Sequence, residues 1–347
     1  MYSETKKSFV AFPGAIILAI ESSCDETAAA VIKGGREILS SKIMSSATEH
    51  VRFGGVVPEI ASRAHTSAVS LVVKEAIEAA GLDLNDIDAV AVTYGAGLLG
   101  ALLVGVSYAK SLAYALDKPL IAVSHIRGHL AAAYLSDKTL EPPFVSLLAS
   151  GGHTAVIVVE SYNDFKILGS TLDDAVGEAF DKVARVLGLN YPGGPNIEKL
   201  AKEGENNVKF PKMLKGEGGY NFSYSGLKTA VINYVHNKQQ TGEPYSRADV
   251  ACSFQAAALD VLVEKAVEAA KEYSLSTITA GGGVVANGYL REKLKAACDK
   301  NGLKLVLPEK VLCTDNAAMI GAEGYLRYLN GEFADLSLNA KARVELK

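Results

Sequence analysis

The hydrophobic and polar positions near the start of the chain follow a hairpin pattern. Residues 15–20 form an apolar run, a polar turn follows at residues 21–27, and a second apolar run ends at Ile32. Short apolar runs bounded by polar turns are typical of β-strands. The pattern predicts a strand hairpin, then a turn at Gly34–Gly35 and a third extended segment.

A second segment, from Phe144 to Val159, has the same pattern. When Thr154 is aligned with Thr27, Ser150 falls on Ser23 and the apolar runs on both sides align without a gap. The chain therefore contains an internal repeat, and each predicted hairpin has a polar tip suited to a ligand.

A strand, a glycine loop and a helix are predicted after each hairpin. Residues 89–97 lead into a helical stretch at 102–115, and residues 277–283 lead into one at 288–297. Glycine tolerates positive φ and close backbone approach, and the following helix N-terminus presents free N–H groups to a phosphate. We expect an α/β protein of two similar lobes with a cleft between them.

The expected boundaries follow the interruptions of this pattern. Polar and proline residues at 136–143 separate the two repeats, and an irregular insertion covers about residues 203–225. The predicted parts are a flexible N-terminal tail at 1–13, an N-terminal lobe at 14–138, a C-terminal lobe at 139–330 and a C-terminal extension at 331–347.

Composition narrows the protein classes. A chain of 347 residues, 49% of them hydrophobic, is long enough for two cores. Its net charge of −4 argues against a protein that binds nucleic acid by overall electrostatic attraction. If the chain acts on RNA, we expect partner proteins to contribute to RNA binding. Four widely spaced cysteines indicate neither a disulfide framework nor a cysteine zinc site, which fits a cytoplasmic protein. The apolar run at 15–20 is too short to span a membrane.

Two histidines are the clearest candidate for chemistry. His125 and His129 lie four residues apart after the apolar run 120–123, so on a helix their imidazoles share one face. A second apolar run, at 303–307, leads to Asp315, which offers a carboxylate from an equivalent place. These three residues are a plausible open metal site. Ile126 stands where the zinc proteases of the His-Glu-x-x-His type carry their glutamate, which disfavours a protease.

Other polar clusters remain open to two interpretations. Asp25 and Glu26 at the first hairpin tip suit metal–water coordination, phosphate orientation or proton removal, although solvated turn acids look the same. The turn Ser150–Thr154 offers backbone amides and hydroxyls to phosphate oxygens, or is a simple hairpin turn. In a helix expected to begin near Leu172, Asp174, Glu178 and Asp181 would share one face, as a solvated surface or as a ribose contact.

Several motifs in the same order resemble those of the TsaD family, also called Gcp, with Kae and OSGEP proteins as its archaeal and eukaryotic members. The resemblance covers nearly the whole chain after the first residues and looks bacterial. The motifs that carry it are Ile20–Thr27, Gly54–Arg63, His125 with His129, Ser150–Thr154, Gly177–Lys182, Tyr191–Pro195, Phe222–Lys228 and Cys313–Asn316.

The resemblance implies the actin-like ATPase (ASKHA) fold of two ribonuclease-H-like lobes. It also implies transfer of a threonylcarbamoyl group from threonylcarbamoyl-AMP to the adenosine 3′ of the anticodon in tRNAs that read ANN codons. His125, His129 and Asp315 would bind Fe2+, or Zn2+, and an ATP-type nucleotide would fit the substrate site. The implied substrate contacts are Leu148, Ala149, Ser150, Gly151, Gly152, Asp181, Gly194, Glu198 and Asn287.

The implied partners are tRNA, the same-fold paralogue TsaB and the ATPase TsaE, with a TsaC-type enzyme supplying the donor. Asp25 or Glu26 would assist deprotonation of the attacking amine. The chain departs from the family pattern at two positions near the first histidine. Relatives commonly carry His or Asn in place of Ser124, and many carry Glu in place of Arg127. Three alternatives stay open: an ASKHA-fold ATPase or kinase, a metalloprotease, which is the historical O-sialoglycoprotein endopeptidase label, and a noncatalytic scaffold.

Overall fold

The computed structural model describes residues 9–211 and 219–344, so the outermost residues of the expected tail and extension and the middle of the expected insertion lie outside the described part. The described chain divides into two compact units. The first contains the residues up to His50, Val56–Leu140 and the residues from Asp315 onward. The second contains Val51–Gly55 and Glu141–Thr314.

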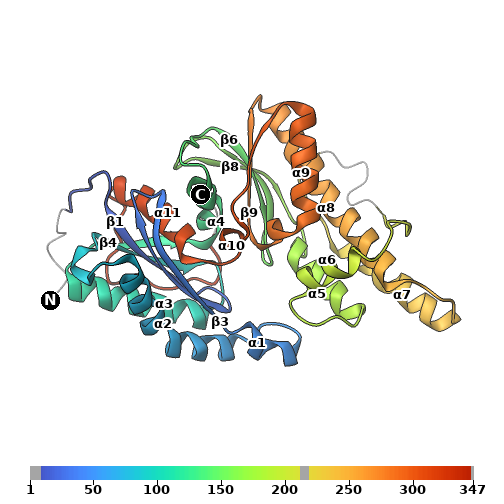
Figure 1. The fold of residues 1–347 in the computed structure, drawn as a ribbon, viewed down its shortest axis with the longest axis horizontal. Helices are drawn as coiled ribbons and strands as arrows, with labels where there is room; N and C mark the ends of the chain where they lie inside the picture. Colours follow the sequence, from blue (N-terminus) through green and yellow to red (C-terminus); the bar gives the residue numbers. More distant parts are fainter. Residues whose placement is uncertain (1–8, 212–218, 345–347) are drawn as a thin grey trace. The chain divides into compact units, whose positions relative to one another are not determined.

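A five-stranded sheet forms the centre of the first unit (Figure 1). Its strands in spatial order are β3 (Glu37–Ser45), β2 (Glu26–Lys33), β1 (Ile16–Glu21), β4 (Ala89–Gly95) and β5 (Leu120–Ser124). The first three run antiparallel to one another, whereas β1, β4 and β5 are parallel. Because β1 is buried on both faces, its apolar run is continuous rather than alternating.

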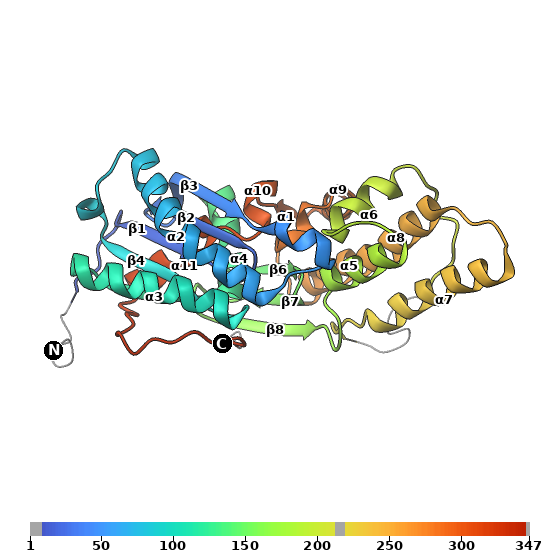
Figure 2. The same cartoon turned by 90° about the horizontal axis from the view of Figure 1, so that it is seen from below.

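Helices cover both faces of this sheet. Helices α2 (Pro58–Ala80) and α3 (Leu99–Leu116) lie side by side on one face (Figure 2), where Leu18, Ile20 and Val92 share a core with them. The other face holds α4 (His125–Ser136) and α11 (Ala317–Leu329). A short helix, α1 (Ala47–His50), follows β3.

The second unit contains a second five-stranded sheet, in the order β10 (Lys304–Val306), β9 (Thr277–Gly281), β6 (Phe144–Ala149), β7 (Thr154–Val159) and β8 (Phe165–Ser170). Phe180, Phe222 and Phe254 lie in the core that packs on it. Its helices are α5 (Val176–Val186), α6 (Gly193–Ala201), α7 (Ser225–Thr241), α8 (Arg247–Glu272), α9 (Gly288–Asn301) and α10 (Lys310–Cys313).

The internal repeat predicted from the sequence is confirmed by topology and register. Both sheets place their first three strands antiparallel and add two parallel strands beside the first. Glu21 pairs with Ala28 in the first hairpin, and Leu148 pairs with Ala155 in the second, which is the same register under the gapless alignment.

Two local expectations differ from the structure. The last long helix, α11, belongs to the first unit, whereas the sequence-based boundaries placed residues up to 330 in the C-terminal lobe. Helix α5 begins at Val176, so Asp174 precedes the helix and does not share a helical face with Glu178 and Asp181. Asp174 nevertheless contacts Lys182, which also pairs with Glu178.

Within the described residues, one helix, α3, has the length and apolar composition that could cross a membrane. Its buried residues, among them Leu102, Val106 and Ala109, pack in the core of the first unit. The core helix of a soluble protein satisfies the same criteria, so the helix is weak evidence for a membrane.

Candidate functional site

His125, His129 and Asp315 come together in the first unit. One Asp315 carboxylate oxygen lies 3.4 Å from Nε2 of His125 and 3.4 Å from Nε2 of His129. Their candidate ligand atoms all lie within 4.8 Å of one another. The structure therefore brings together the three residues that the sequence singled out as metal ligands.

Each side chain is positioned by the start of a helix. Helix α4 begins at His125, directly after the parallel strand β5, and its two histidines are buried with ring centroids 4.6 Å apart. Asp315 precedes Asn316, the N-cap of α11, whose side-chain oxygen accepts a hydrogen bond from the Met319 amide at 3.0 Å. Packing of α4 against α11 then holds the carboxylate opposite the imidazoles.

The donor atoms suit a divalent transition metal. Nδ1 of the buried His129 has no hydrogen-bond partner among the described residues, and Nε2 has only the Asp315 carboxylate at 3.4 Å. Unsatisfied buried nitrogens are unfavourable, and a bound cation would satisfy Nε2. Two imidazoles and one carboxylate are ligands typical of Zn2+ and non-haem Fe2+ sites with open positions.

Glu21 is a further member of this cluster that the sequence did not single out. It is the last residue of β1 and is fully buried. Its Oε2 lies 3.0 Å from Nδ1 of His125 and accepts a hydrogen bond from the Thr93 hydroxyl at 2.7 Å. The sequence does contain a signal for Glu21, since its carboxylate directly follows five apolar strand residues. An acid in such a place is expected to be buried and therefore to need a polar or charged partner.

The charges of this cluster are mutually dependent. Burial by itself would raise the pKa of Glu21, but the adjacent His125 ring keeps that pKa below its usual range. Likewise, burial opposes ionisation of Asp315, yet the two histidines hold its pKa far below normal. Burial would lower the pKa of His125, but Asp315 and Glu21 raise it, whereas burial and the neighbouring His125 lower the pKa of His129. The site therefore favours carboxylates that are ionised and ready to bind a cation.

The polar tip that carries Asp25 and Glu26 is a turn held by buried side chains. Nδ1 of His65 lies 2.7 Å from the Thr27 hydroxyl, and its Nε2 lies 3.0 Å from the Cys24 carbonyl. The Ser46 amide and hydroxyl donate to the Asp25 carbonyl at 2.9 and 3.0 Å. The backbone of this turn is thus fixed, with Asp25 buried and Glu26 accepting a hydrogen bond from the Ser45 hydroxyl at 3.1 Å.

A glycine packs against the same turn. Gly97 has φ 154°, and a Cβ at this position would lie 2.5 Å from the Ser23 carbonyl oxygen. That carbonyl accepts a hydrogen bond from the Leu98 amide at 2.8 Å. The close approach that the glycine loop was expected to allow is therefore an approach to the polar turn.

Glu26 and Cys24 have altered protonation equilibria. Burial, with the negative charges of Asp25 and Asp315, raises the pKa of Glu26 to about 9. Burial and the same acids also raise the pKa of the Cys24 thiol. At neutral pH Glu26 is therefore a proton donor rather than a base, and Cys24 is a thiol.

The predicted substrate residues 148–152 belong to the second unit. Leu148 and Ala149 end β6, and Ser150 begins the turn, its amide donating to the His153 carbonyl at 2.8 Å. Gly151 and Gly152 are exposed. The Gly177 amide donates to the Ser150 carbonyl at 3.2 Å, which places the turn against the N-terminus of α5.

The remaining predicted substrate residues lie at helix N-termini of the same unit or accept hydrogen bonds from them. Asp181 accepts a hydrogen bond from the Gly193 amide at 2.7 Å, at the start of α6, where Gly194 follows. Glu198 accepts one from the Gly288 amide at 3.1 Å, at the start of α9. Asn287 is the N-cap of α9 and also donates to Gln255 at 2.9 Å. The N-terminus of α5 thus adjoins the glycine turn and is suited to an anion, whereas the Asp181 and Glu198 carboxylates already accept amides at the starts of α6 and α9.

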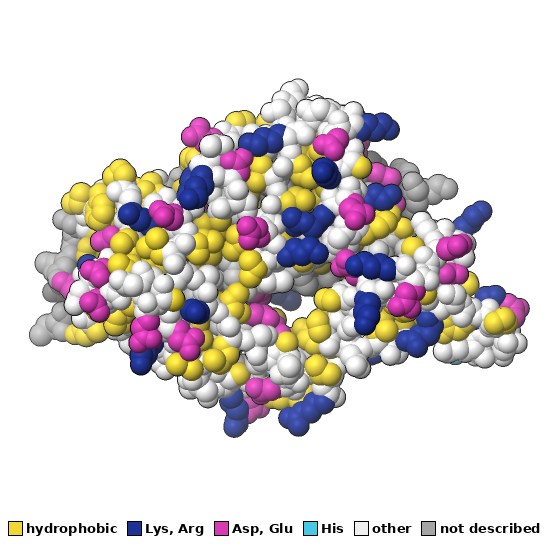
Figure 3. All heavy atoms as spheres, viewed as in Figure 1, with side chains coloured by type: hydrophobic (Ala, Val, Ile, Leu, Met, Phe, Trp, Pro, Cys, Tyr) yellow, Lys and Arg dark blue, Asp and Glu magenta, His cyan; other side chains and the backbone are white. Residues whose placement is uncertain are grey.

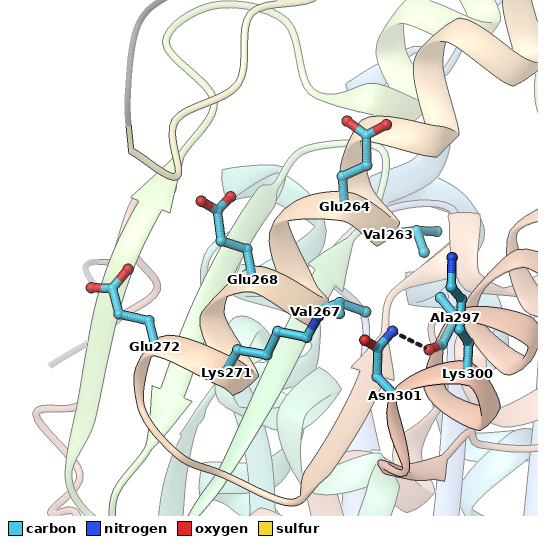
Figure 4. Close-up of a pocket in the computed structure, with 9 residues that line it drawn as sticks. All are labelled: Val263, Glu264, Val267, Glu268, Lys271, Glu272, Ala297, Lys300 and Asn301. Carbon is cyan, nitrogen blue, oxygen red and sulfur yellow. Dashed lines mark hydrogen bonds between the residues drawn. The ribbon is translucent and has the colours of Figure 1, made fainter.

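Two hollows lie in the second unit. A cavity of about 90 Å³ is lined by Asp181, Tyr191 and Gly193 among others. A groove of about 660 Å³ between α8 and α9 has an apolar floor, with Val263 and Val267, and a rim that includes Glu264 and Lys300 (Figure 4). The predicted site residues contribute to the small cavity and not to the groove, so the groove is not the candidate active site.

Comparison with known proteins gives a consistent result. A sequence model of the family described as "TsaD: tRNA N6-adenosine threonylcarbamoyltransferase" matches residues 37–322. A protein of Clostridium perfringens (strain SM101 / Type A) with this enzyme name is 55% identical over 332 residues, covering 95% of this chain and 98% of the relative. One of Clostridium botulinum (strain 657 / Type Ba4) with the same name is 52% identical, covering 95% and 97%.

Solved structures support the fold. Full-length HypF in a phosphate- and nucleotide-bound form is similar with a TM-score of 0.63 and 16% identity, over 94% of this chain and 48% of HypF. This chain thus spans about half of that protein. Component A of the (R)-2-hydroxyglutaryl-CoA dehydratase of Acidaminococcus fermentans has a TM-score of 0.53 and 15% identity, over 90% and 99%. These are ASKHA-fold proteins, and the predicted fold class is confirmed.

Proposed function

Because this chain belongs to the TsaD family of tRNA N6-adenosine threonylcarbamoyltransferases, we propose that His125, His129 and Asp315 hold the divalent metal ion of that reaction. The chain is an acyltransferase that modifies tRNA, as its relatives are named. We infer Fe2+ as the resident ion and Zn2+ as an alternative, since both accept this ligand set. The observation that carries the assignment is the convergence of these three side chains in a chain 55% identical to named transferases.

The donor that we propose is threonylcarbamoyl-AMP, and the acceptor is the N6 amine of the adenosine 3′ of the anticodon in tRNAs that read ANN codons. The amine nitrogen forms a bond to the carbamoyl carbon, the bond from that carbon to the phosphate oxygen breaks, and AMP leaves. The nitrogen loses one proton. The reaction therefore needs oxyanion stabilisation, leaving-group stabilisation and a proton acceptor.

The residues of the chain can meet these needs. A bound metal with open positions would orient and polarise the donor's oxygens. The turn 148–152 and the N-terminus of α5 offer amides and a positive dipole end for the nucleotide phosphate, with Asp181, Gly194, Glu198 and Asn287 as further contacts. Asp25 is the proton acceptor that we favour, because Glu26 holds its own proton at neutral pH.

Exposed lysines on two of these helices support a tRNA surface. Lys199 and Lys202 lie on or just after α6, and Lys293 and Lys295 lie on α9; all four are exposed. Figure 3 shows Lys and Arg side chains gathering on this face of the second unit. Because phosphates dominate nucleic-acid affinity, a local basic surface can bind tRNA despite a net charge of −4.

The remaining parts of the proposal concern partners and location. The negative net charge supports a need for help with tRNA, and we propose TsaB and TsaE as complex partners and a TsaC-type enzyme as the source of the donor. Four free cysteines fit a reducing cytoplasm, where tRNA is modified. The transferase relatives give no support to the ATPase, protease or scaffold alternatives.

The decisive experiment combines the chain with these partners, threonine, bicarbonate, ATP and unmodified tRNA. Nucleoside mass spectrometry should detect threonylcarbamoyladenosine with the wild type and lose it with Asp315→Ala. Asp299→Ala, which changes an exposed acid on α9, is the matched control and should keep activity. Absence of product with the wild type, or equal product with Asp315→Ala, would overturn the proposal.

A further inference from the structure

The carboxylate of Glu21 is fully buried, and each of its oxygens has a defined neighbour. Oε1 accepts a hydrogen bond from the Ser23 amide at 2.5 Å, and Oε2 accepts one from the Thr93 hydroxyl at 2.7 Å. The third neighbour is Nδ1 of His125, 3.0 Å from Oε2. Burying a carboxylate is costly, so three partners of this kind indicate a built arrangement rather than a chance contact.

These contacts settle which ring nitrogen of His125 carries a proton. An ionised carboxylate only accepts hydrogen bonds, so the nitrogen beside it must donate. With Nδ1 held as a donor to Glu21, Nε2 is the nitrogen that faces Asp315 and the position between the proposed ligands. The Ser23 hydroxyl, 3.1 Å from the same Nδ1, is a second polar neighbour on that side of the ring.

We propose that Glu21 is a positioning residue that holds His125 in its Nδ1–H tautomer and directs Nε2 to the metal. The inference rests on the metal site proposed above and adds a residue to it. Metal-binding histidines commonly donate their second N–H to a carboxylate, which fixes the ring and increases its basicity. Glu21 supplies that carboxylate from a different strand of the same sheet.

The proposal distinguishes the two histidines. Nε2 of each ring lies 3.4 Å from Asp315, but Nδ1 of His129 has no hydrogen-bond partner in the described chain. His125 is therefore the preorganised ligand. Because the other oxygen of Glu21 accepts from Ser23, the same carboxylate also shapes the turn that carries Asp25.

A purely structural role for Glu21 would leave metal binding unchanged, so the test measures metal directly. Metal-free wild type, Glu21→Gln and Glu21→Asp are titrated with Co2+ and Zn2+ against a chromophoric chelator. Gln removes the negative charge, and Asp keeps the charge but shortens the reach to His125. Both should bind metal about 10–100-fold more weakly than the wild type, the usual effect of losing such a partner.

The matched control is Asp88→Asn. Asp88 accepts a hydrogen bond from the Ile16 amide at 2.8 Å, at the opposite end of the same strand β1, so it tests loss of a carboxylate without a histidine partner. Its metal affinity should match the wild type. In parallel, NMR of the Zn2+-bound protein should show the Nδ1–H proton of His125 far downfield in the wild type, because it donates to the Glu21 carboxylate, and upfield of that position in Glu21→Gln.

Thermal unfolding identifies variants that do not fold. If Glu21→Gln does not fold, the metal affinities of Glu21→Asp and Thr93→Val test the inference instead. Thr93→Val removes the 2.7 Å hydrogen bond to Glu21 and should weaken metal binding by a smaller factor than Glu21→Asp. Folded variants whose His125 Nδ1–H chemical shift matches the wild type and whose metal affinity lies within twofold of it would overturn the inference. Weak metal binding in these variants, together with an inactive wild type, would reject the transferase proposal and leave the role of Glu21 intact.

Discussion

At the scale of single residues, the two acids of the first hairpin tip differ although they are adjacent in sequence. Burial, Asp25 and Asp315 raise the pKa of Glu26 to about 9, so near pH 7 Glu26 is neutral. A glutamine has nearly the same shape as a protonated glutamic acid. Replacing Glu26 by Gln therefore preserves its neutral form, whereas Asn at position 25 removes the carboxylate that we propose as base.

We predict that Asp25→Asn lowers the single-turnover transfer rate at pH 7 by about 100-fold or more, as expected for loss of a general base. Glu26→Gln should stay within about threefold of the wild type, because it retains the uncharged form that the site favours. The rates are compared at saturating tRNA and donor. A rate for Glu26→Gln as low as that for Asp25→Asn would assign the base to Glu26 instead.

Arg127 is close in sequence to the proposed ligands and forms an ion pair that links the two helices next to them. It lies between the two histidines in sequence, but its Nε lies 2.5 Å from the buried carboxylate of Glu323 on α11. The resemblance to the family pattern left Arg127 as a departure, and the structure shows that Glu323 is its partner, although burial raises the pKa of Glu323 to about 7. The pair links the helix that carries both histidines to the helix that follows Asp315.

We predict that Arg127→Met lowers the free energy of unfolding by about 3–5 kcal/mol, because it leaves the Glu323 carboxylate buried without its main partner. The double variant Arg127→Met, Glu323→Met should recover most of this loss, since apolar side chains can replace a buried ion pair. Arg63→Met is the control: Arg63 pairs with Glu59 at the surface, with its side chain 80% exposed, and should cost less than about 1 kcal/mol. Equal losses in both single variants, measured by urea unfolding, would contradict this.

At the scale of the elements, Asp173 shows how an irregular segment is fixed to the second unit. Its carboxylate accepts hydrogen bonds from the Tyr224 and Ser225 amides at 2.7 and 3.2 Å and from the Ser223 and Ser225 hydroxyls at 2.5 and 2.6 Å. These donors lie at the start of α7. Asp173 therefore acts as a capping residue supplied from a distant part of the chain.

We predict that Asp173→Ala costs about 1–2 kcal/mol of unfolding free energy near pH 7. Burial alone would raise the pKa of Asp173, but the Ser223 and Ser225 hydrogen bonds lower it below the ordinary value of 3.8. A depressed pKa contributes stability above the unfolded value and loses it as pH falls. The stability difference between wild type and variant should thus be constant above about pH 5 and shrink below pH 3.8. A difference that grew in acid would contradict the assignment.

The elements differ in how well sequence predicted them. The hairpins, β5, α3 and α9 follow from local apolar runs and glycine loops, and the histidine pair follows from spacing on a helix. The start of α5 was wrong because the expected helix included Asp173 and Asp174. In the structure both side chains bind the region around α7 about 50 residues later, an interaction that no local pattern encodes.

For the candidate site too, residues in local sequence patterns could be predicted, whereas contacts made by tertiary folding could not. His125, His129 and Asp315 could be proposed from sequence because two histidines four residues apart after one apolar run, and an aspartate after another, are a pattern typical of a metal site. Glu21 was missed because its partners, Thr93 and His125, are brought beside β1 only by sheet pairing. Asp181 and Glu198 were expected to contact substrate, which stays a prediction; in the structure they accept backbone amides at helix starts.

At the scale of the whole molecule, the chain leaves the first unit at Leu140 and returns to it at Asp315. The returning helix α11 packs closely on the sheet: a Cβ added to Gly321 would lie 2.4 Å from Ile32, and one added to Gly324 would lie 2.7 Å from Ala91. Met319 and Ile320 are fully buried. The first unit is therefore incomplete without its C-terminal segment, which also supplies the proposed third ligand.

This organisation predicts that the first unit alone binds metal. A chain that joins residues 1–140 to 315–347 by a flexible glycine–serine linker contains His125, His129, Asp315 and Glu21 together with α11. We expect it to unfold cooperatively and to bind one Co2+ or Zn2+ ion with an affinity within about tenfold of the full chain, because all ligands and the carboxylate behind His125 belong to this unit.

Two fragments serve as its controls. Residues 1–140 alone lack the helix that covers β1 and β2, so they should bind a hydrophobic dye and unfold without a cooperative transition. Adding residues 315–347 through the linker should reverse both properties, whereas the same addition with Asp315→Ala should restore folding and not metal binding. Metal affinity in residues 1–140 equal to that of the linked chain would show that Asp315 is not a ligand, since the two histidines alone would then suffice.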